Sequence, residues 1–214
     1  MRVAIAGGHG KIGSRLIRLL AARGDEARSL DRNPAYGEEI RAAGGEPVVC
    51  DLESADPGEV APVLDQVDAV VFSAGAGPGS GPDRKWTMDH GGAVRLIEAA
   101  RAAGVSRYVM VSSIGADPDT PGEDTFAVYL RAKGRADADL RASGLEFTIV
   151  RPVRLTDDPG TGMVAAGVSV GRGEISRDDV AAALLAVLDT LSTVGKSFEL
   201  TSGETPIPDA IAAL

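Results

Sequence analysis

The residues best placed to do chemistry are a tyrosine and a lysine four positions apart, Tyr129 and Lys133. The surrounding segment, 126–140, reads as a helix, so the two side chains lie one turn apart on one face. An ammonium held there stabilises the phenolate form of the tyrosine, and the phenol could give a proton to a carbonyl oxygen as hydride arrives. Lys133 would also reach the ribose of a nicotinamide nucleotide. Because this spacing is common on ordinary solvated helices, its meaning depends on the elements around it.

Two serines favour the catalytic interpretation of this pair. Ser112 and Ser113 end a strand predicted over 107–112, which places a hydroxyl near the same carbonyl. Successive residues of a strand point to opposite faces, so one residue of register decides which hydroxyl faces the site.

A glycine-rich segment near the start of the chain predicts a dinucleotide-binding turn. Residues 7–13 read Gly-Gly-His-Gly-Lys-Ile-Gly, after the apolar run 1–6 and before apolar residues at helical spacing. The glycines match Gly-x-Gly-x-x-Gly and also the wider Gly-x-x-Gly-x-x-Gly spacing. They would let the chain turn tightly, let backbone N–H groups approach a pyrophosphate, and let helix and sheet pack closely. The positive end of the helix dipole would then face the phosphates.

Strands and helices alternate along the chain. Strands are predicted over 27–30, 47–50, 68–72, 107–112, 146–150 and 197–200. Four helical runs end in a glycine, as helix C-termini often do: Gly24, Gly44, Gly104 and Gly144. This alternation predicts an α/β fold, a doubly wound parallel sheet of the Rossmann type, with ligands at the carboxyl edge. The glycine-rich stretch 75–83 follows a strand and is expected to be a loop at that edge.

We expect a single domain, 1–214, with a dinucleotide-binding core over 1–150 and a small substrate-side extension over 151–214. In the extension, Ser176 and Asp179 resemble a capping box before the apolar run 180–188. A final helix is expected near Pro208. The extension should close over the cofactor edge and form a small substrate pocket.

Composition limits the possible partners. The 214 residues carry a net charge of −9, which argues against nucleic acid or an anionic membrane surface. No apolar stretch is long enough to span a bilayer. The single cysteine, Cys50, excludes an internal disulfide and is expected on a buried strand. A cytoplasmic location follows as an expectation. His9 and His90 have no ligand cluster around them, so no metal site is predicted; His9 is expected over the phosphates.

The end of the second strand bears on the choice of cofactor. Asp31 lies where a carboxylate holds the ribose hydroxyls of NAD, whereas Arg32 could grip the 2′-phosphate of NADP. The two side chains therefore favour opposite cofactors, and an Asx turn into Asn33 and Pro34 is compatible with either. We slightly favour NADP(H) over NAD(H).

The chain resembles the small atypical short-chain dehydrogenase/reductases, NAD(P)H-binding proteins often described as epimerase- or dehydratase-like. The motifs that carry the resemblance are residues 7–13, Val-Ser-Ser-Ile-Gly-Ala-Asp (111–117), Tyr-Leu-Arg-Ala-Lys (129–133), Phe-Thr-Ile-Val-Arg-Pro-Val (147–153) and Ile-Ser-Arg-Asp-Asp-Val-Ala (175–181). The family more usually has threonine at His9 and a non-acidic residue at Asp31, which bears on the NADP preference.

The resemblance implies a role for each matching position. Ser113, Tyr129 and Lys133 would be catalytic, with Ser112 as the next candidate for the serine. The resemblance implies Gly7, Gly10 and Gly13 at the phosphates, Arg32 at the 2′-phosphate, Asp51 and Leu52 at the adenine, Ala74 and Gly75 along the adenosine ribose, and Pro152 and Val153 near the nicotinamide. We also expect His9, Lys11, Ile12, Asp31, Ser112 and Lys133 to contact the cofactor.

Three functions fit these patterns. The first is an NAD(P)H-dependent oxidoreductase that moves hydride to a small carbonyl-type substrate. The second is a sensor or regulatory protein that binds NADP(H) with little turnover. The third is a nucleotide-sugar epimerase- or dehydratase-like enzyme, which normally needs a larger substrate lobe. A homodimer could form through segments 84–103 and 126–140, where relatives commonly pair.

Overall fold

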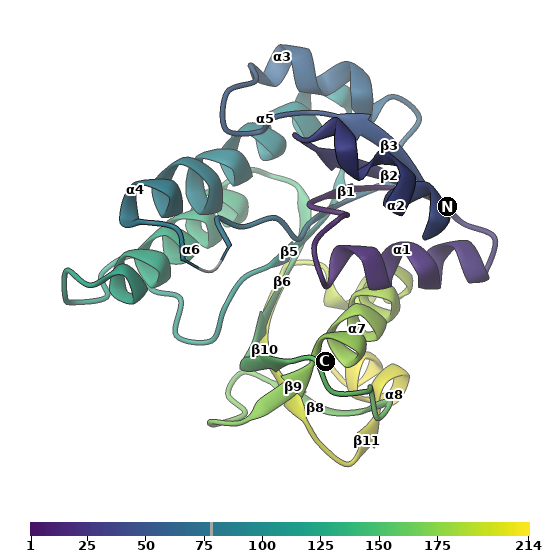
Figure 1. The fold of residues 1–214 in the computed structure, drawn as a ribbon. Helices are drawn as coiled ribbons and strands as arrows, with labels where there is room; N and C mark the ends of the chain where they lie inside the picture. Colours follow the sequence, from purple (N-terminus) through teal and green to yellow (C-terminus); the bar gives the residue numbers. More distant parts are fainter. Residues whose placement is uncertain (78) are drawn as a thin grey trace.

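A sheet of nine strands runs through the computed structural model, which describes residues 1–77 and 79–214 (Figure 1). The strand order is β11-β8-β10-β6-β5-β4-β1-β2-β3. The strands are β1 (Arg2–Ala6), β2 (Glu26–Asp31), β3 (Gly45–Val49), β4 (Ala69–Phe72), β5 (Arg107–Val111), β6 (Glu146–Pro152), β8 (Met163–Gly167), β10 (Lys196–Ser202) and β11 (Thr205–Pro206). A separate parallel pair is formed by β7 (Arg154–Thr156) and β9 (Glu174–Ser176).

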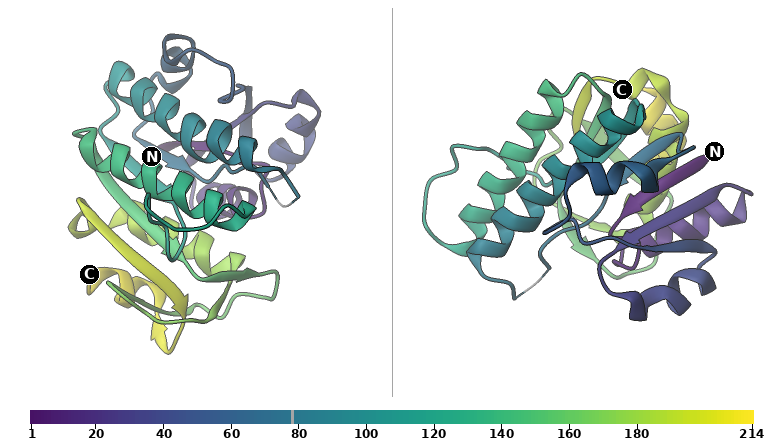
Figure 2. Two further views of the ribbon diagram at one scale, coloured as in Figure 1. Left: turned by 90° about the vertical axis from the view of Figure 1, so that its left-hand side faces the viewer. Right: turned by 90° about the horizontal axis from the view of Figure 1, so that it is seen from above.

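Helices cover both faces of the large sheet (Figures 1 and 2). The α-helices are α1 (Gly13–Ala22), α2 (Gly37–Ala42), α3 (Pro57–Val60), α4 (Pro82–Arg84), α5 (Ala93–Ala103), α6 (Thr125–Ala142), α7 (Arg177–Asp189) and α8 (Ile207–Ala212). Three 3₁₀ turns are η1 (Pro34–Tyr36), η2 (Ala61–Leu64) and η4 (Leu191–Thr193), and a π-helix, η3, runs over Lys85–Gly92. The architecture is the predicted doubly wound, Rossmann-like fold.

The central strands are buried on both faces, and their side chains alternate between two apolar clusters. Val3 and Ile5 of β1 join the cluster under α1, α7 and α8, whereas Ala4 and Ala6 join the cluster under α3, α5 and α6. Successive side chains of a strand point to opposite faces, and here both faces are covered. Short, continuous apolar runs therefore form these strands.

The predicted elements are confirmed in position, within a few residues at their ends. The four predicted helix-ending glycines all adopt positive φ angles, between 74° and 92°. Ser176 caps α7, its hydroxyl accepting the Asp179 N–H at 3.0 Å. Residue 78 of the predicted loop 75–83 lies outside the described residues.

Two expectations were wrong. The sheet is not wholly parallel, because β8 runs antiparallel to β10 and to β11. Cys50 does not lie on a buried strand: it follows β3, which is the outermost strand of the sheet, and it is only partly buried.

The segment 151–214 does more than line a pocket. β6 crosses residue 150, and β8, β10 and β11 extend the main sheet beyond it. At the cofactor edge, the described residues of this segment that line a large cavity come from the end of β6, from β7, from the loop before β9 and from the first residue of α7. Most of the segment therefore contributes to the core, and a small part of it faces the cofactor edge.

Candidate functional site

The glycine turn between β1 and α1 is shaped for close approach. Gly7 has a φ angle of +78°, and a Cβ atom there would lie 2.8 Å from the Ala74 Cα. The Gly10 N–H donates to the Gly7 carbonyl at 2.9 Å, and a Cβ at Gly13 would collide with that carbonyl. Ile12, before the first residue of α1, has no side-chain acceptor for the free N–H groups of the helix. Free backbone N–H groups at the start of a helix, next to glycines that allow close approach, can bind a pyrophosphate.

A small cavity of about 110 Å³ lies beside this turn, at the ends of β2 and β3. Six of the predicted cofactor residues line it: Gly7, Arg32, Asp51, Leu52, Ala74 and Gly75. Arg84, which sequence analysis did not single out, lines it as well. The guanidinium groups of Arg32 and Arg84 both pair with the Glu53 carboxylate, at 3.1 and 3.0 Å. Because sequence analysis expects these residues at the adenosine part of the cofactor, we call this space the adenosine cavity.

The Asp31 carboxylate is turned toward the glycine turn. It accepts the His9 N–H at 3.3 and 3.4 Å and the Ser29 hydroxyl at 2.5 Å. The His9 ring stacks on Tyr36 with their centres 3.5 Å apart, and its Nε2 lies 3.0 Å from Glu39. The imidazole of His9 thus packs beside η1, while its backbone N–H stays at the turn.

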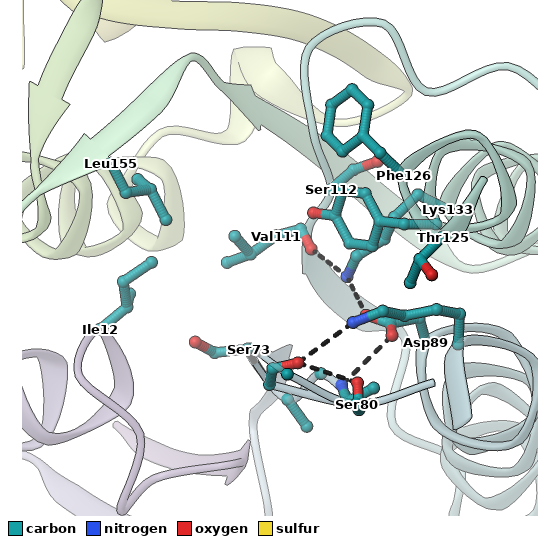
Figure 3. A pocket seen from close by; sticks show the side chains of 17 residues that line it. Ile12, Ser73, Ser80, Asp89, Val111, Ser112, Thr125, Phe126, Lys133 and Leu155 are labelled. Atoms are coloured by element: carbon teal, nitrogen blue, oxygen red, sulfur yellow. Dashed lines mark hydrogen bonds and ion pairs between the residues drawn. The ribbon is translucent and has the colours of Figure 1, made fainter. Parts of the chain in front are cut away.

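A second cavity, of about 520 Å³, opens between the carboxyl ends of β4 and β5 and the helices η3 and α6 (Figure 3). Lys133 enters it from α6, and its Nζ donates to the Val111 carbonyl at 3.0 Å and lies 3.6 Å from an Asp89 oxygen. The other Asp89 oxygen accepts the Ala76 N–H at 3.2 Å. The side chains of Asp89 and Lys133 are only 2% and 5% exposed. They form a buried ion pair tied to the loop after β4.

The π-helix η3 supplies Asp89 and a second cation. Lys85 donates from Nζ to the Gly77 carbonyl at 3.1 Å, and its Nζ is 5.7 Å from the centre of the Tyr129 ring. π-helical segments are rare and often occur at functional sites. Sequence analysis missed both residues, because a π-helix has no clear sequence signal and Asp89 resembles any polar residue near a helix start.

Tyr129 lies where the second cavity meets a third, of about 570 Å³. Ser112, Phe126, Tyr129 and Leu155 line both cavities, whereas Ser113 lines only the third. The Ser113 hydroxyl donates to the Ile114 carbonyl at 3.1 Å. The structure therefore brings both serines, Tyr129 and Lys133 to one edge, with Ser112 at the junction.

Ser112 also borders a buried charged group behind the cavities. Asp137, fully buried on α6, accepts from Arg151 at 2.6 and 2.9 Å. Burial raises the pKa of Asp137, and the charge of Arg151 and the nearby Ser112 hydroxyl lower it less. The Ser112 hydroxyl and one Asp137 oxygen are buried and complete no hydrogen bond within the described chain. Since the Ser112 hydroxyl lowers the pKa of Asp137, it faces that buried carboxyl group.

The third cavity is formed by the end of β6, by β7 and by the residues around β9. Pro152 and Val153 line it, as do Arg154, Arg172 and Arg177. Lys11 of the glycine turn is exposed and pairs with Asp157, which also accepts from Arg177 at 2.9 Å. Asp157 thereby links the glycine turn to the border of this cavity.

His90 does not line any of these three cavities. Its Nε2 lies 2.7 Å from Asp139, on the outer side of α6. Across the described residues, no cluster of three or more histidine, cysteine, aspartate or glutamate side chains is arranged to hold a metal ion. The helices found in the described part of the chain all fall short of the length and apolarity that a membrane span needs.

Comparison with protein families matches residues 7–191 to a family described as NAD(P)H-binding. The protein belongs to this NAD(P)H-binding family. The "uncharacterized sugar epimerase YhfK" of Bacillus subtilis (strain 168) is 40% identical over 215 residues, with both chains covered completely. A solved Bacillus halodurans protein, provisionally named an NAD-dependent epimerase/dehydratase, is 38% identical, with both chains covered completely and a TM-score of 0.92. The oxidoreductase ylbE of Lactococcus lactis is 27% identical, with 100% of this chain and 96% of that chain covered and a TM-score of 0.86.

These relatives confirm the resemblance to epimerase- and dehydratase-like NAD(P)H-binding proteins. The Bacillus halodurans structure shares this fold over the whole described chain. The shared part includes the antiparallel strands at the end of the sheet. A nicotinamide cofactor therefore belongs to the family, and the glycine turn and adenosine cavity fit it.

Proposed function

We propose that this protein transfers hydride between a nicotinamide nucleotide and a small carbonyl-type substrate, with Tyr129 as the proton donor and acceptor. The observation that carries the proposal is the position of Tyr129 at the junction of the two large cavities. One cavity continues toward the glycine turn through Ile12, Ala74 and Gly75, and the other opens toward the C-terminal strands. A phenol at such a junction can face a nucleotide from one side and a substrate from the other.

Two cations lie near this phenol. Lys133 lies one helical turn away, and Lys85 lies 5.7 Å from the ring centre. Tyr129 would donate its proton to the substrate oxygen during reduction and take it back in the reverse direction. The hydroxyl of Ser113 or that of Ser112 would hold that oxygen, since both serines line the third cavity.

The bound nucleotide would supply or accept the hydride. Gly7, Gly10 and Gly13, with the start of α1, would hold its pyrophosphate, and Asp51 and Leu52 would hold its adenine. Lys133 would donate to the nicotinamide ribose, and Pro152 and Val153 would border the nicotinamide.

We propose NADP(H) as the preferred cofactor. Arg32 and Arg84 both border the adenosine cavity, and Arg32 is still half exposed, so it can turn from Glu53 to a 2′-phosphate. Asp31 is held by His9 and Ser29, which keeps its negative charge turned to the glycine turn. Titration of NADPH and NADH at one salt concentration tests this preference; equal or tighter binding of NADH would refute it.

The catalytic proposal is tested with Tyr129→Phe. A panel of small aldehydes and ketones is first screened for NADPH oxidation by the wild type. The variant should lose turnover on the best substrate by about 10²–10⁴-fold, the usual contribution of a general acid, with NADPH affinity nearly unchanged. Phe147→Leu, which alters an aromatic ring packed on the core and outside both large cavities, is the matched control. Unchanged turnover in Tyr129→Phe would exclude the role of this phenol.

An epimerase-type reaction is the second candidate, because two close relatives carry epimerase names. In that reaction the hydride returns to the substrate, so the nucleotide is not consumed. The same Tyr129 and Lys133 would serve. Product formation without net oxidation of NADPH would favour the epimerase, and one NADPH oxidised per product would favour the reductase.

A further inference from the structure

Three arginines border the third cavity, and among the described residues no carboxylate side chain lines it. The arginines are Arg154, Arg172 and Arg177. The whole chain has a net charge of −9, so the positive charge at this cavity is opposite in sign to the net charge of the protein. A local cationic border of this kind attracts anionic ligands.

The three guanidinium groups differ in how they are paired. Arg154 pairs with Glu174, which lies opposite it in the β7–β9 register, and Arg177 pairs with Asp157. Both carboxylates are about half exposed, at 52% and 48%, so water screens these pairs. Arg172 makes no ion pair within the described part of the chain. An incoming anion would therefore meet one unpaired guanidinium and two that are weakly held.

Arg172 is exposed and precedes a glycine that packs closely on β10. A Cβ atom at Gly173 would lie 2.5 Å from the Thr201 Oγ1, so the loop before β9 packs closely against β10. Arg177 is placed by the start of α7, which Ser176 caps. An exposed cation, Arg172, and a partly exposed one, Arg177, therefore both line the cavity.

Apart from Ser112 and Ser113, the remaining wall of the cavity is apolar. Its side chains include Ile114, Phe126, Val153 and Leu155, together with the ring of Tyr129. Burying an apolar body against this wall would be favourable, and only the arginine border offers a counter-charge. The cavity, at about 570 Å³, is in the usual size range for a small-molecule site.

We propose that the substrate is an apolar carbonyl compound that carries an anionic oxygen group, a carboxylate or a phosphate. Arg172 and Arg177 hold the anionic group, because a guanidinium presents paired N–H donors to such oxygens. The apolar body lies along Phe126 and Leu155, and the carbonyl faces Tyr129. This inference rests on the proposed function, since it assigns the substrate class of the same cavity.

Calorimetric titration of the full chain, saturated with NADP⁺, tests the inference with three ligands of one shape. They are 2-naphthoate, 2-naphthyl phosphate and the neutral 2-naphthamide. At least one of the two anions should bind about tenfold more tightly than the amide. The anion that binds more tightly shows whether the site prefers a carboxylate or a phosphate. Arg172→Gln should remove most of that difference and leave the affinity for the amide unchanged. Arg101→Gln, an exposed arginine on α5, is the matched control and should change neither affinity.

Three results would overturn the inference. One is equal affinity for the amide and both anions. Another is an anion preference that persists in the double variant Arg172→Gln/Arg177→Gln. The third is a large loss of NADP⁺ affinity in that double variant with the anion preference intact, which would assign these arginines to the cofactor. Absence of NADP⁺ and NAD⁺ binding would instead overturn the proposed function, and titration of the nucleotide-free protein would still decide the anion preference.

Discussion

Replacing Asp89 by asparagine removes the negative charge that faces buried Lys133. The two charged groups are 3.6 Å apart and almost completely buried. At an effective dielectric constant of about 20, their attraction is about 332/(20 × 3.6), or roughly 4.6 kcal/mol. The cost of burying the carboxylate offsets part of this attraction. Asparagine keeps an oxygen for the Ala76 N–H but leaves the ammonium with only the Val111 carbonyl.

We expect Asp89→Asn to lower the free energy of unfolding by about 3 kcal/mol, near the lower end of the usual cost of breaking a buried ion pair. Urea denaturation at pH 7 measures this change. Asp139→Asn is the matched control, because Asp139 pairs with His90 across the same two helices but is half exposed. It should cost less than about 1 kcal/mol.

A double variant separates the charge from simple packing. If the loss in Asp89→Asn arises from the unpaired ammonium, adding Lys133→Met should restore part of the stability. The reasoning fails if Asp89→Asn is no more destabilising than the Asp139 control, or if Lys133→Met lowers the stability of Asp89→Asn further.

Two further predictions concern groups whose pKa is shifted. Burial, with a smaller contribution from Asp51, raises the pKa of the Cys50 thiol to about 11. Iodoacetamide at pH 8 should therefore modify Cys50 roughly 100-fold more slowly than an exposed thiol. A modification rate equal to that of glutathione would contradict this prediction. Burial also raises the pKa of Asp137 above its unfolded value, so its contribution to stability is complete at low pH and is lost as pH rises through the raised pKa. The free energy of unfolding of the wild type minus that of Asp137→Asn should fall as the pH rises above about 4, the ordinary pKa of an aspartate, in chemical denaturation. A rise would show that the sign is wrong.

The sequence by itself determined most of the elements and their order, although the strands β7, β8, β9 and β11 were not predicted. Short apolar runs form strands buried on both faces, and glycines end the helices, because both patterns depend on local backbone geometry and on which faces are covered. The glycine turn and the one-turn spacing of Tyr129 and Lys133 follow from the same local rules. Most of the predicted adenosine residues gather at one cavity because the carboxyl ends of parallel strands share one edge.

Only the tertiary structure decided which groups meet across that edge. Asp89 reaches Lys133 because a π-helical segment places it under the loop after β4. No local sequence pattern predicts this π-helical segment. The position of Ser112 at the junction of two cavities depends on how β5 ends against α6. Arg154, Arg172 and Arg177 come together through the β7–β9 pair and the packing of Gly173 on Thr201, contacts between segments far apart in the chain. Local propensity specifies a helix or a strand, whereas such long-range contacts depend on the packing of the whole sheet.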